Sequence, residues 1–176
     1  NLNFTNSFFE SMSGITTTGS TVIIDIESSP PGILVWRSLL QWLGGIGVIV
    51  MAIAIFPMLS VGGMQLFKTE NFEAPEKVIP RATSLARGIF IIYSVLTLIW
   101  ATLLYFSGMY AFDAILHSMT TIATGGYSTK TNSIGAFNSY IIDWVIIIGM
   151  IMGSLPFIHY LALTRGSFND LIKDSQ

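Results

Sequence analysis

The sequence predicts an all-α membrane protein built from repeated units, each with a spanning helix, a short re-entrant helix with a polar loop, and a second spanning helix. Three observations support this fold class. Of the 176 residues, 52% are hydrophobic and only 10% are charged, against roughly 25% charged in an ordinary soluble domain. The uncharged residues gather in long blocks. One Thr- and Gly-rich segment occurs twice.

Three uncharged blocks, 38–67, 88–112 and 144–164, are long enough to cross a membrane, because each reaches the roughly 20 residues that a spanning helix requires. Two shorter blocks, 11–24 and 114–129, are rich in Ser, Thr and Gly rather than in Leu and Ile. Segments of that length are typical of re-entrant or interfacial structure. The expected order along the chain is therefore dip, span, span, dip, span.

The two dipping segments form an internal repeat. Residues 11–19 align without a gap with residues 118–126, which lie 107 positions later, and five of the nine pairs are identical. The shared residues are small and polar, so the likeness does not come from apolar bulk. Repetition in matched surroundings favours one role for both segments.

A short apolar run precedes each dipping segment, and we expect both runs, 4–12 and 111–119, to form helices. Asn6 and Asp113 are equivalent residues at their outer starts, and both residue types can cap a helix N-terminus. Backbone that is neither helix nor closed sheet is tolerated at membrane depth only against protein or a water-filled cavity. The two segments are therefore predicted to line a pore.

A Thr- and Gly-rich loop has the chemistry to bind a dehydrated cation. Glycine adopts the positive φ angles that turn successive carbonyl oxygens to one side, and hydroxyl side chains add further oxygen ligands. The preceding short helix aims its negative C-terminal end at the same place. Rings of such carbonyls can replace the water around a monovalent cation.

Charge gives the expected orientation in the membrane. Of the eight basic residues, six lie in the segment 60–87 and in the tail, and an excess of Lys and Arg marks the cytoplasmic side. Both dipping segments then open on the opposite face. The net charge of −2 and the scattered basic residues exclude a nucleic-acid groove. The absence of cysteine excludes a thiolate nucleophile and a disulfide framework.

These expectations divide the chain into four parts. Residues 1–63 form the pore loop and second span of a first repeat that lacks its first span. Residues 64–87 form a cytoplasmic loop, residues 88–163 form a complete second repeat of span, pore loop and span, and residues 164–176 form a cytoplasmic tail.

Five stretches carry a resemblance to a known family. They are FFESMSGITTTGSTVI at 8–23, WRSLLQWLGGIGVIVMAIAIFPMLSVGG at 36–63, IPRATSLARGIF at 79–90, GMYAFDAILHSMTTIATGGYST at 108–129 and KDSQ at 173–176. Through them the chain resembles the Trk/Ktr/HKT superfamily of potassium uptake proteins, and within it the bacterial Trk membrane subunits. The likeness extends over essentially the whole sequence.

The resemblance implies a fold of the potassium-channel-like type, in which four pore-loop repeats in one polypeptide each give one strand of a potassium selectivity filter. The chain then looks like a fragment that supplies about half a filter. The filter residues that would bind K⁺ are four in each loop: Thr16, Thr17, Thr18 and Gly19, and Ala123, Thr124, Gly125 and Gly126. Ala123 and Gly125 lack a hydroxyl group, which leaves only main-chain oxygens at those levels.

The resemblance also implies partners and a location. A second copy of the subunit would make a homodimer, and a cytosolic nucleotide-binding regulatory subunit of the TrkA type would bind the inner surface. The protein would be a multi-pass protein of the inner, cytoplasmic membrane, in contact with lipid. It would transport potassium and would have no enzyme activity or catalytic residue.

Two other functions compete with potassium transport. The first is a structural helical bundle without ion conduction, whose dipping segments only dock helices against one another. The second is an intramembrane enzyme that uses His117 with Asp113, four residues apart on one helix face. We expect His117 to brace its short helix instead, and Arg37 to hold a pore loop through Glu10 or to reach the lipid headgroups. Glycines in the spans are expected to serve packing.

Overall fold

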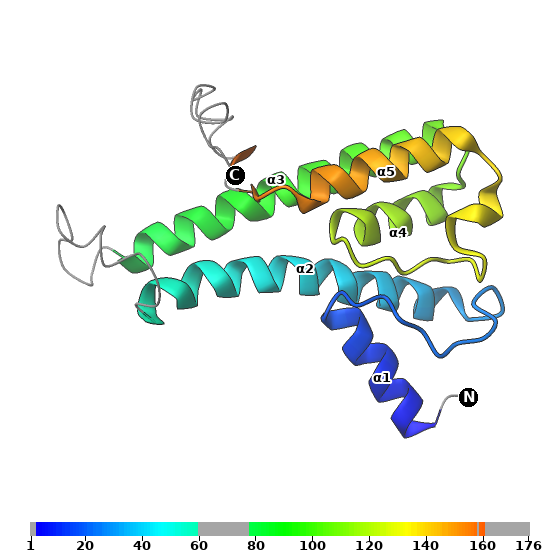
Figure 1. Ribbon diagram of the computed structural model, residues 1–176, viewed down its shortest axis with the longest axis horizontal. Helices are drawn as coiled ribbons and strands as arrows, with labels where there is room; N and C mark the ends of the chain where they lie inside the picture. The colour runs from blue at the N-terminus through cyan, green and yellow to red at the C-terminus, as the bar shows by residue number, and fades with distance from the viewer. Residues whose placement is uncertain (1–2, 60–77, 158, 161–176) are drawn as a thin grey trace. The chain divides into compact units, whose positions relative to one another are not determined.

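The computed structural model describes residues 3–59, 78–157 and 159–160, and within these ranges it contains helices and no strand. In chain order the elements are α1 (Phe4–Ile15), α2 (Pro31–Leu59), α3 (Val78–Phe106), α4 (Ala111–Ile122), the 3₁₀ helix η3 (Ser133–Phe137) and α5 (Tyr140–Ser154). Figure 1 shows them in sequence colours. The fold class predicted from the sequence is confirmed.

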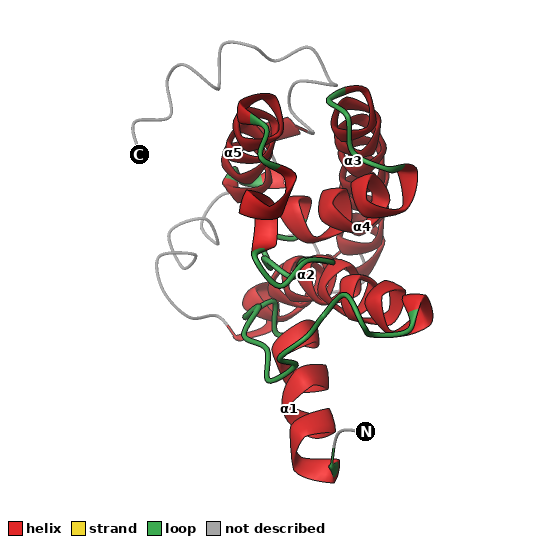
Figure 2. Cartoon of the chain, turned by 90° about the vertical axis from the view of Figure 1, so that its right-hand side faces the viewer, coloured by secondary structure: helices red, strands yellow, loops and turns green. Residues whose placement is uncertain are grey.

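The chain divides into two compact units. One, here called the loop unit, contains the described residues of 1–46 and 93–156, and the other contains those of 47–92 and 157–176. The loop unit holds both dipping segments, α1, α4 and α5, and the adjoining parts of α2 and α3. Figure 2 shows its helices and the green loops that follow α1 and α4.

The two short helices are confirmed as a repeat, since α1 and α4 each contain 12 residues and start 107 positions apart. The predicted caps are wrong. Asn3 caps α1, because its side chain accepts a hydrogen bond of 2.8 Å from the Asn6 N–H. Tyr110 stands at the N-cap of α4 and gives no side-chain cap. Asn6 and Asp113 therefore lie inside the first turns of their helices.

Two helices, over Pro31–Met51 and Ser84–Phe106, are long and apolar enough to cross a membrane. The helices that contain them, α2 and α3, begin before the uncharged blocks 38–67 and 88–112, respectively. Helix α2 includes Arg37, whose charge is paired inside the protein, and α3 begins within the predicted cytoplasmic loop of residues 64–87. The rest of that loop, from residue 64 to residue 77, lies outside the described residues.

The third predicted span does not continue as one helix. Helix α5 ends at Ser154, and Leu155 is extended with ψ 141°. The physical cause is Pro156, because proline disfavours helical backbone in the residue before it. With 15 residues, α5 is shorter than a span. The predicted tail of residues 164–176 lies outside the described residues.

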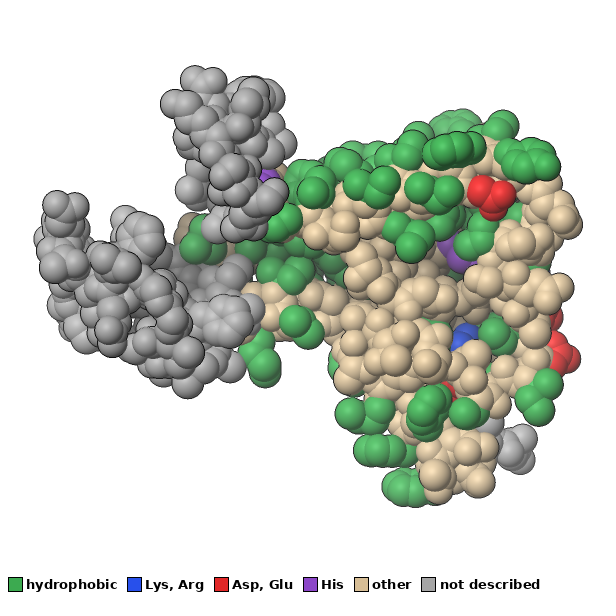
Figure 3. All heavy atoms as spheres, in the orientation of Figure 1, with side chains coloured by type: hydrophobic (Ala, Val, Ile, Leu, Met, Phe, Trp, Pro, Cys, Tyr) green, Lys and Arg blue, Asp and Glu red, His purple; other side chains and the backbone are tan. Residues whose placement is uncertain are grey.

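The cores of the loop unit surround α4. One cluster joins α3, α4 and α5 with Met109 from the turn between α3 and α4, and its members are Leu104, Met109, Ala114, Ile142 and Ile146. A second cluster joins Leu34 of α2 and Leu116 of α4 with Ile26 from the first loop. The outer surface of α5 is apolar, with exposed Ile141, Trp144 and Ile148, and Figure 3 shows hydrophobic side chains over this helix. Such a surface suits lipid or further helices.

Candidate functional site

The loops that follow α1 and α4 have the same backbone conformation. In the first, Thr17 and Gly19 have φ angles of 55° and 79°, and in the second, Thr124 and Gly126 have φ angles of 52° and 83°. The residues between them keep negative φ, so the sign alternates along each loop. Positive φ is costly for a β-branched residue, so its recurrence at two equivalent threonines marks a shared strained geometry.

The main-chain amides of both loops fold back onto their helices. In each loop, three consecutive N–H groups donate to carbonyls of the last helical turn, at distances from 2.8 to 3.1 Å. The pairs are Thr16 to Met12, Thr17 to Gly14 and Thr18 to Ser13, and then Ala123 to Met119, Thr124 to Thr121 and Gly125 to Thr120. This is the Schellman pattern of helix termination with threonine in the left-handed position. It pairs the N–H groups of the loop residues with the helix and leaves the carbonyl oxygens of the loop residues without a partner in the helix.

Most carbonyl oxygens of the two loops accept no hydrogen bond from the part of the chain that the structure describes. This holds for the four residues of the first loop, 16–19, and for Ala123, Thr124 and Gly126 of the second. The carbonyl of Gly125 accepts a hydrogen bond of 2.9 Å from the Gln41 side chain. Seven of the eight carbonyls of these two loops therefore have no hydrogen-bond donor among the described residues.

The two loops meet at backbone level. A Cβ atom on Gly19 would lie 2.0 Å from the carbonyl oxygen of Gly125, a distance at which no side chain fits. Glycine at position 19 is therefore required by its positive φ and by the close approach of the second loop.

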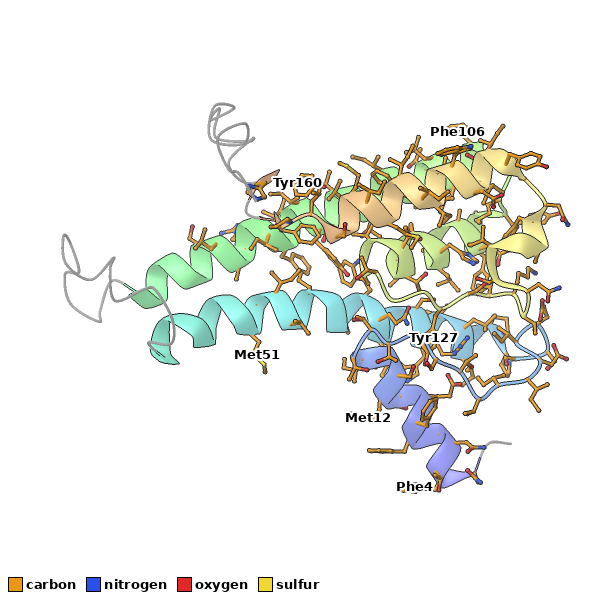
Figure 4. All side chains as sticks on the ribbon, in the orientation of Figure 1. Phe4, Met12, Met51, Phe106, Tyr127 and Tyr160 are labelled. Atoms are coloured by element: carbon orange, nitrogen blue, oxygen red, sulfur yellow. The ribbon has the colours of Figure 1, made fainter. Side chains whose placement is uncertain are left out.

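Arg37 of α2 ties both loops together. Its Nε donates to Glu10 Oε2 at 3.2 Å, and its Nη1 donates to the Ser128 carbonyl at 3.3 Å. Its guanidinium carbon lies 4.0 Å from the centre of the Tyr127 ring. The Tyr127 hydroxyl in turn donates to the Glu10 carbonyl at 2.8 Å. Figure 4 labels Tyr127 beside α2. The predicted contact between Arg37 and Glu10 is confirmed.

Glu10 is a buried carboxylate held in its charged form. Burial raises the pKa of Glu10, but hydrogen bonds from the Thr21 hydroxyl and the Val22 N–H, with the Arg37 charge, hold it below its ordinary value of 4.5. The Val22 N–H donates at 2.6 Å. Charge-assisted bonds of this kind fix the segment after the first loop to the side of α1.

His117 takes the place of Glu10 in the second repeat. Its Nδ1 lies 2.8 Å from the Asp113 carbonyl, which can only accept, so Nδ1 carries a proton. Burial lowers the pKa of His117, which favours the neutral ring, and the Ser128 hydroxyl then donates to Nε2 at 3.0 Å. Thr21 and Ser128 are equivalent residues, so both repeats fasten the chain after the loop in the same way.

The acid–base pair of His117 and Asp113 that the competing enzyme hypothesis requires does not form, and the expected bracing role of His117 is confirmed. His117 contacts the Asp113 main chain, and the Asp113 carboxylate accepts a hydrogen bond of 2.6 Å from the Thr129 hydroxyl. Both side chains are buried and serve as braces for the second loop.

Glycines of α2 and α5 let the short helices pack closely. A Cβ on Gly44 of α2 would lie 2.0 Å from the Ile15 carbonyl oxygen, and one on Gly153 of α5 would lie 2.8 Å from the Ile122 carbonyl oxygen. Ile15 and Ile122 are the equivalent last residues of α1 and α4. The predicted packing role of Gly44 and Gly153 is confirmed, whereas Gly47 has open space around it.

A cavity of about 580 Å³ adjoins the second loop, and its walls come from α4, the loop, η3 and α5. Thr124 and Gly126 line it from the loop, and Met150 and Ser154 line it from α5. Atoms of the second loop are therefore accessible from this cavity.

Sequence reasoning gave no role to Gln41. This side chain is fully buried and bonds the second loop on both sides of Gly126. A usable signal was present, because a lone amide within an apolar spanning segment is costly unless it is paired. Its partner, 84 residues away in the sequence, could not be identified from spacing.

Comparison with known proteins gives one consistent result. The profile of the TrkH family, described as a cation transport protein, matches residues 1–173. The Trk system potassium uptake protein TrkI of Halomonas elongata is 46% identical over 176 residues, which cover 99% of this chain and 36% of that protein. The Trk system potassium uptake protein TrkH of Escherichia coli K12 is 44% identical, over 100% of this chain and 37% of that protein.

A solved structure agrees. The crystal structure of the potassium transporter TrkH from Vibrio parahaemolyticus matches with a TM-score of 0.80 and 40% identity, over 94% of this chain and 33% of that chain. The chain thus spans about a third of the length of the relatives it matches.

Proposed function

This chain belongs to the TrkH family of cation transport proteins, and from that premise we propose that its two loops form part of a selectivity filter for potassium. The residues that bind the ion are those of the two repeats, Thr16, Thr17, Thr18 and Gly19 with Ala123, Thr124, Gly125 and Gly126. Potassium is the transported ion and undergoes no chemical change, so the chain carries no catalytic residue.

One observation supports this proposal above the others. The two loops, 107 positions apart, share alternating φ signs and the same set of amide bonds to the preceding helix. In a chain of alternating handedness, successive carbonyls turn to one side, and the amides are already used. A group of such oxygens, with the C-terminal ends of α1 and α4 behind them, favours a dehydrated cation.

The proposal extends to the membrane and to partners. The protein lies in the cytoplasmic membrane with several spans, and its apolar outer helices face lipid or other helices of the same protein. The resemblance to Trk subunits supports a homodimer and a cytosolic nucleotide-binding regulatory subunit of the TrkA type.

The test compares two glycines that both have open space for a side chain. Gly126 has φ 83°, and Gly32 at the start of α2 has no positive φ. In a complete transport protein that carries residues 1–176, Gly126→Ser strains the loop by roughly 1–2 kcal/mol. Because this strain turns the carbonyls that select the ion, we expect selectivity for potassium over sodium to fall by up to about tenfold. Gly32→Ser leaves selectivity unchanged. Rubidium and sodium fluxes measure both.

Equal selectivity in the two variants would contradict the filter assignment. Water-borne thiol reagents give an independent answer, since a cysteine at position 16 or 18 is modified if the first loop lines a pore. Full protection of both cysteines would favour a structural bundle without ion conduction.

A further inference from the structure

Gln41 makes an unusual contact with the main chain of the second loop. Its Nε2 donates to the Gly125 carbonyl at 2.9 Å, and its Oε1 accepts from the Tyr127 N–H at 3.0 Å. The two bonds straddle Gly126, whose φ is 83°. One side chain therefore fixes the peptide groups on both sides of the glycine that the proposed filter depends on.

The position of the Gln41 amide explains a sequence difference between the two loops. Thr18 stands in the first loop where the second has Gly125. A Cβ on Gly125 would lie 2.4 Å from Gln41 Cδ and 2.5 Å from Gln41 Oε1. Any side chain at position 125 would therefore displace the amide, and glycine is needed there to admit Gln41.

The contact is made by α2 and is not repeated by α5. Gly44 and Gly153 cover the last carbonyls of α1 and α4, respectively, so they mark equivalent levels of α2 and α5. Three residues before them stand Gln41 and Met150. Met150 is exposed and lines the cavity beside the second loop. The amide is thus a local addition that acts on one loop from the side.

We propose that Gln41 is a positioning residue that orients the Gly125 carbonyl and the Gly126 peptide, and that it thereby sets the discrimination between potassium and sodium. The inference rests on the proposed function of the loops. It adds that the two loops are not equivalent, because one carbonyl of the second loop is held by α2 and its direction depends on that bond.

Two substitutions separate this role from simple packing. Gln41→Met keeps the volume and removes both hydrogen bonds. Gln41→Glu keeps the shape and an acceptor for the Tyr127 N–H, but it places an oxygen opposite the Gly125 carbonyl. Leu40→Met on the same helix is the control, since Leu40 packs against Gly14 of α1 and volume-conserving changes of this kind are tolerated.

The readout is the ratio of rubidium to sodium flux in a complete transport protein that carries residues 1–176. A ratio does not depend on the amount of protein in the membrane, so poor folding of one variant does not obscure it. We expect the ratio to fall about tenfold for Gln41→Met and at least as far for Gln41→Glu, the size set by losing oriented hydrogen bonds. Leu40→Met keeps the parental ratio.

The inference is overturned if both Gln41 variants keep the parental ratio, or if the rubidium and sodium fluxes fall by the same factor. If Gln41→Met does not reach the membrane, Gln41→Glu decides. A parent protein without selective rubidium flux contradicts the proposed function itself. A selective parent with unaffected Gln41 variants contradicts only the role of Gln41.

Discussion

The loops after α1 and α4 share one backbone conformation in very different surroundings. Helix α4 has eight buried residues out of 12, whereas α1 has three, namely Glu10, Ser13 and Gly14. Phe4 and Phe8 of α1 are exposed at 86% and 59%. Since burial differs and conformation does not, the loop geometry is set locally by helix termination and by glycine. Packing sets how firmly each loop is held.

The anchors also differ between the repeats. A charged carboxylate, Glu10, holds the first segment with the help of Arg37, and a neutral imidazole, His117, holds the second. In both repeats a hydroxyl, from Thr21 or Ser128, contacts the anchor and accepts an N–H bond from two residues later. One backbone conformation is thus fixed by two different electrostatic arrangements, and substitutions in either repeat can disrupt it.

The largest effect is expected at the filter glycines. Gly19→Ala adds a Cβ 2.0 Å from the Gly125 carbonyl oxygen in addition to its positive φ, whereas an added Cβ on Gly126 meets no atom within 4 Å. Gly126→Ala adds only the roughly 1–2 kcal/mol of left-handed strain and should reduce selective transport. Gly19→Ala should abolish selective transport. Rubidium uptake by the complete protein measures both. A milder effect at Gly19 would show that the loops do not approach closely.

The next effect is expected at the anchors. Arg37→Met leaves the buried Glu10 carboxylate without its cation, which should cost about 3–5 kcal/mol of unfolding free energy. His117→Gln removes a neutral hydrogen bond and should cost about 1 kcal/mol. Thermal unfolding in detergent ranks the two. Adding Glu10→Gln to Arg37→Met should recover part of the loss, and absence of recovery would mean that the ion pair is not the cause.

Acid should weaken the two repeats in different ranges of pH. The pKa of His117 is lowered from 6.5 by burial, so its unfolded form binds the proton first and its contribution to stability falls as pH drops below that value. The pKa of Glu10 is lowered from 4.5, so its contribution is lost only below that pH. Melting temperature measured from pH 8 to about pH 2 tests this. His117→Gln should remove the upper phase alone, and two unchanged phases would contradict the assignment.

The smallest effect is expected at the paired hydroxyls. Thr21→Val and Ser128→Ala each remove one hydroxyl that contacts an anchor and accepts a main-chain N–H. Each should lower the unfolding free energy by about 1 kcal/mol. Thr102→Val on the exposed face of α3 is the control, since Thr102 bonds only within its helix. Losses that match the control would mean that the hydroxyls do not fasten the loops.

Local patterns predicted much of this arrangement. The 107-residue repeat predicted α1 and α4 and the glycines of positive φ, because these features depend on neighbouring residues. The conformation of Thr17 and Thr124 could not be predicted, since threonine disfavours positive φ. The break at Leu155 could have been, because Pro156 determines it.

Contacts distant in sequence set the rest. The start of α2 was predicted too late because Arg37 counts as a charge until its partner Glu10 is known. Gln41 showed its importance only through bonds to Gly125 and Tyr127. The helix-cap prediction failed for a local reason. The cap of α1 is Asn3, three residues before the predicted Asn6, and its side chain accepts a hydrogen bond from the Asn6 N–H.

The central claim is that the two loops direct their free carbonyls to one shared ion. The most direct measurement is a structure of the complete transport protein in rubidium, with anomalous scattering used to locate the ion. We expect rubidium within bonding distance of carbonyl oxygens from both residues 16–19 and residues 123–126. Rubidium bound elsewhere, for example only in the cavity beside Met150, with the loop carbonyls unoccupied, would contradict it.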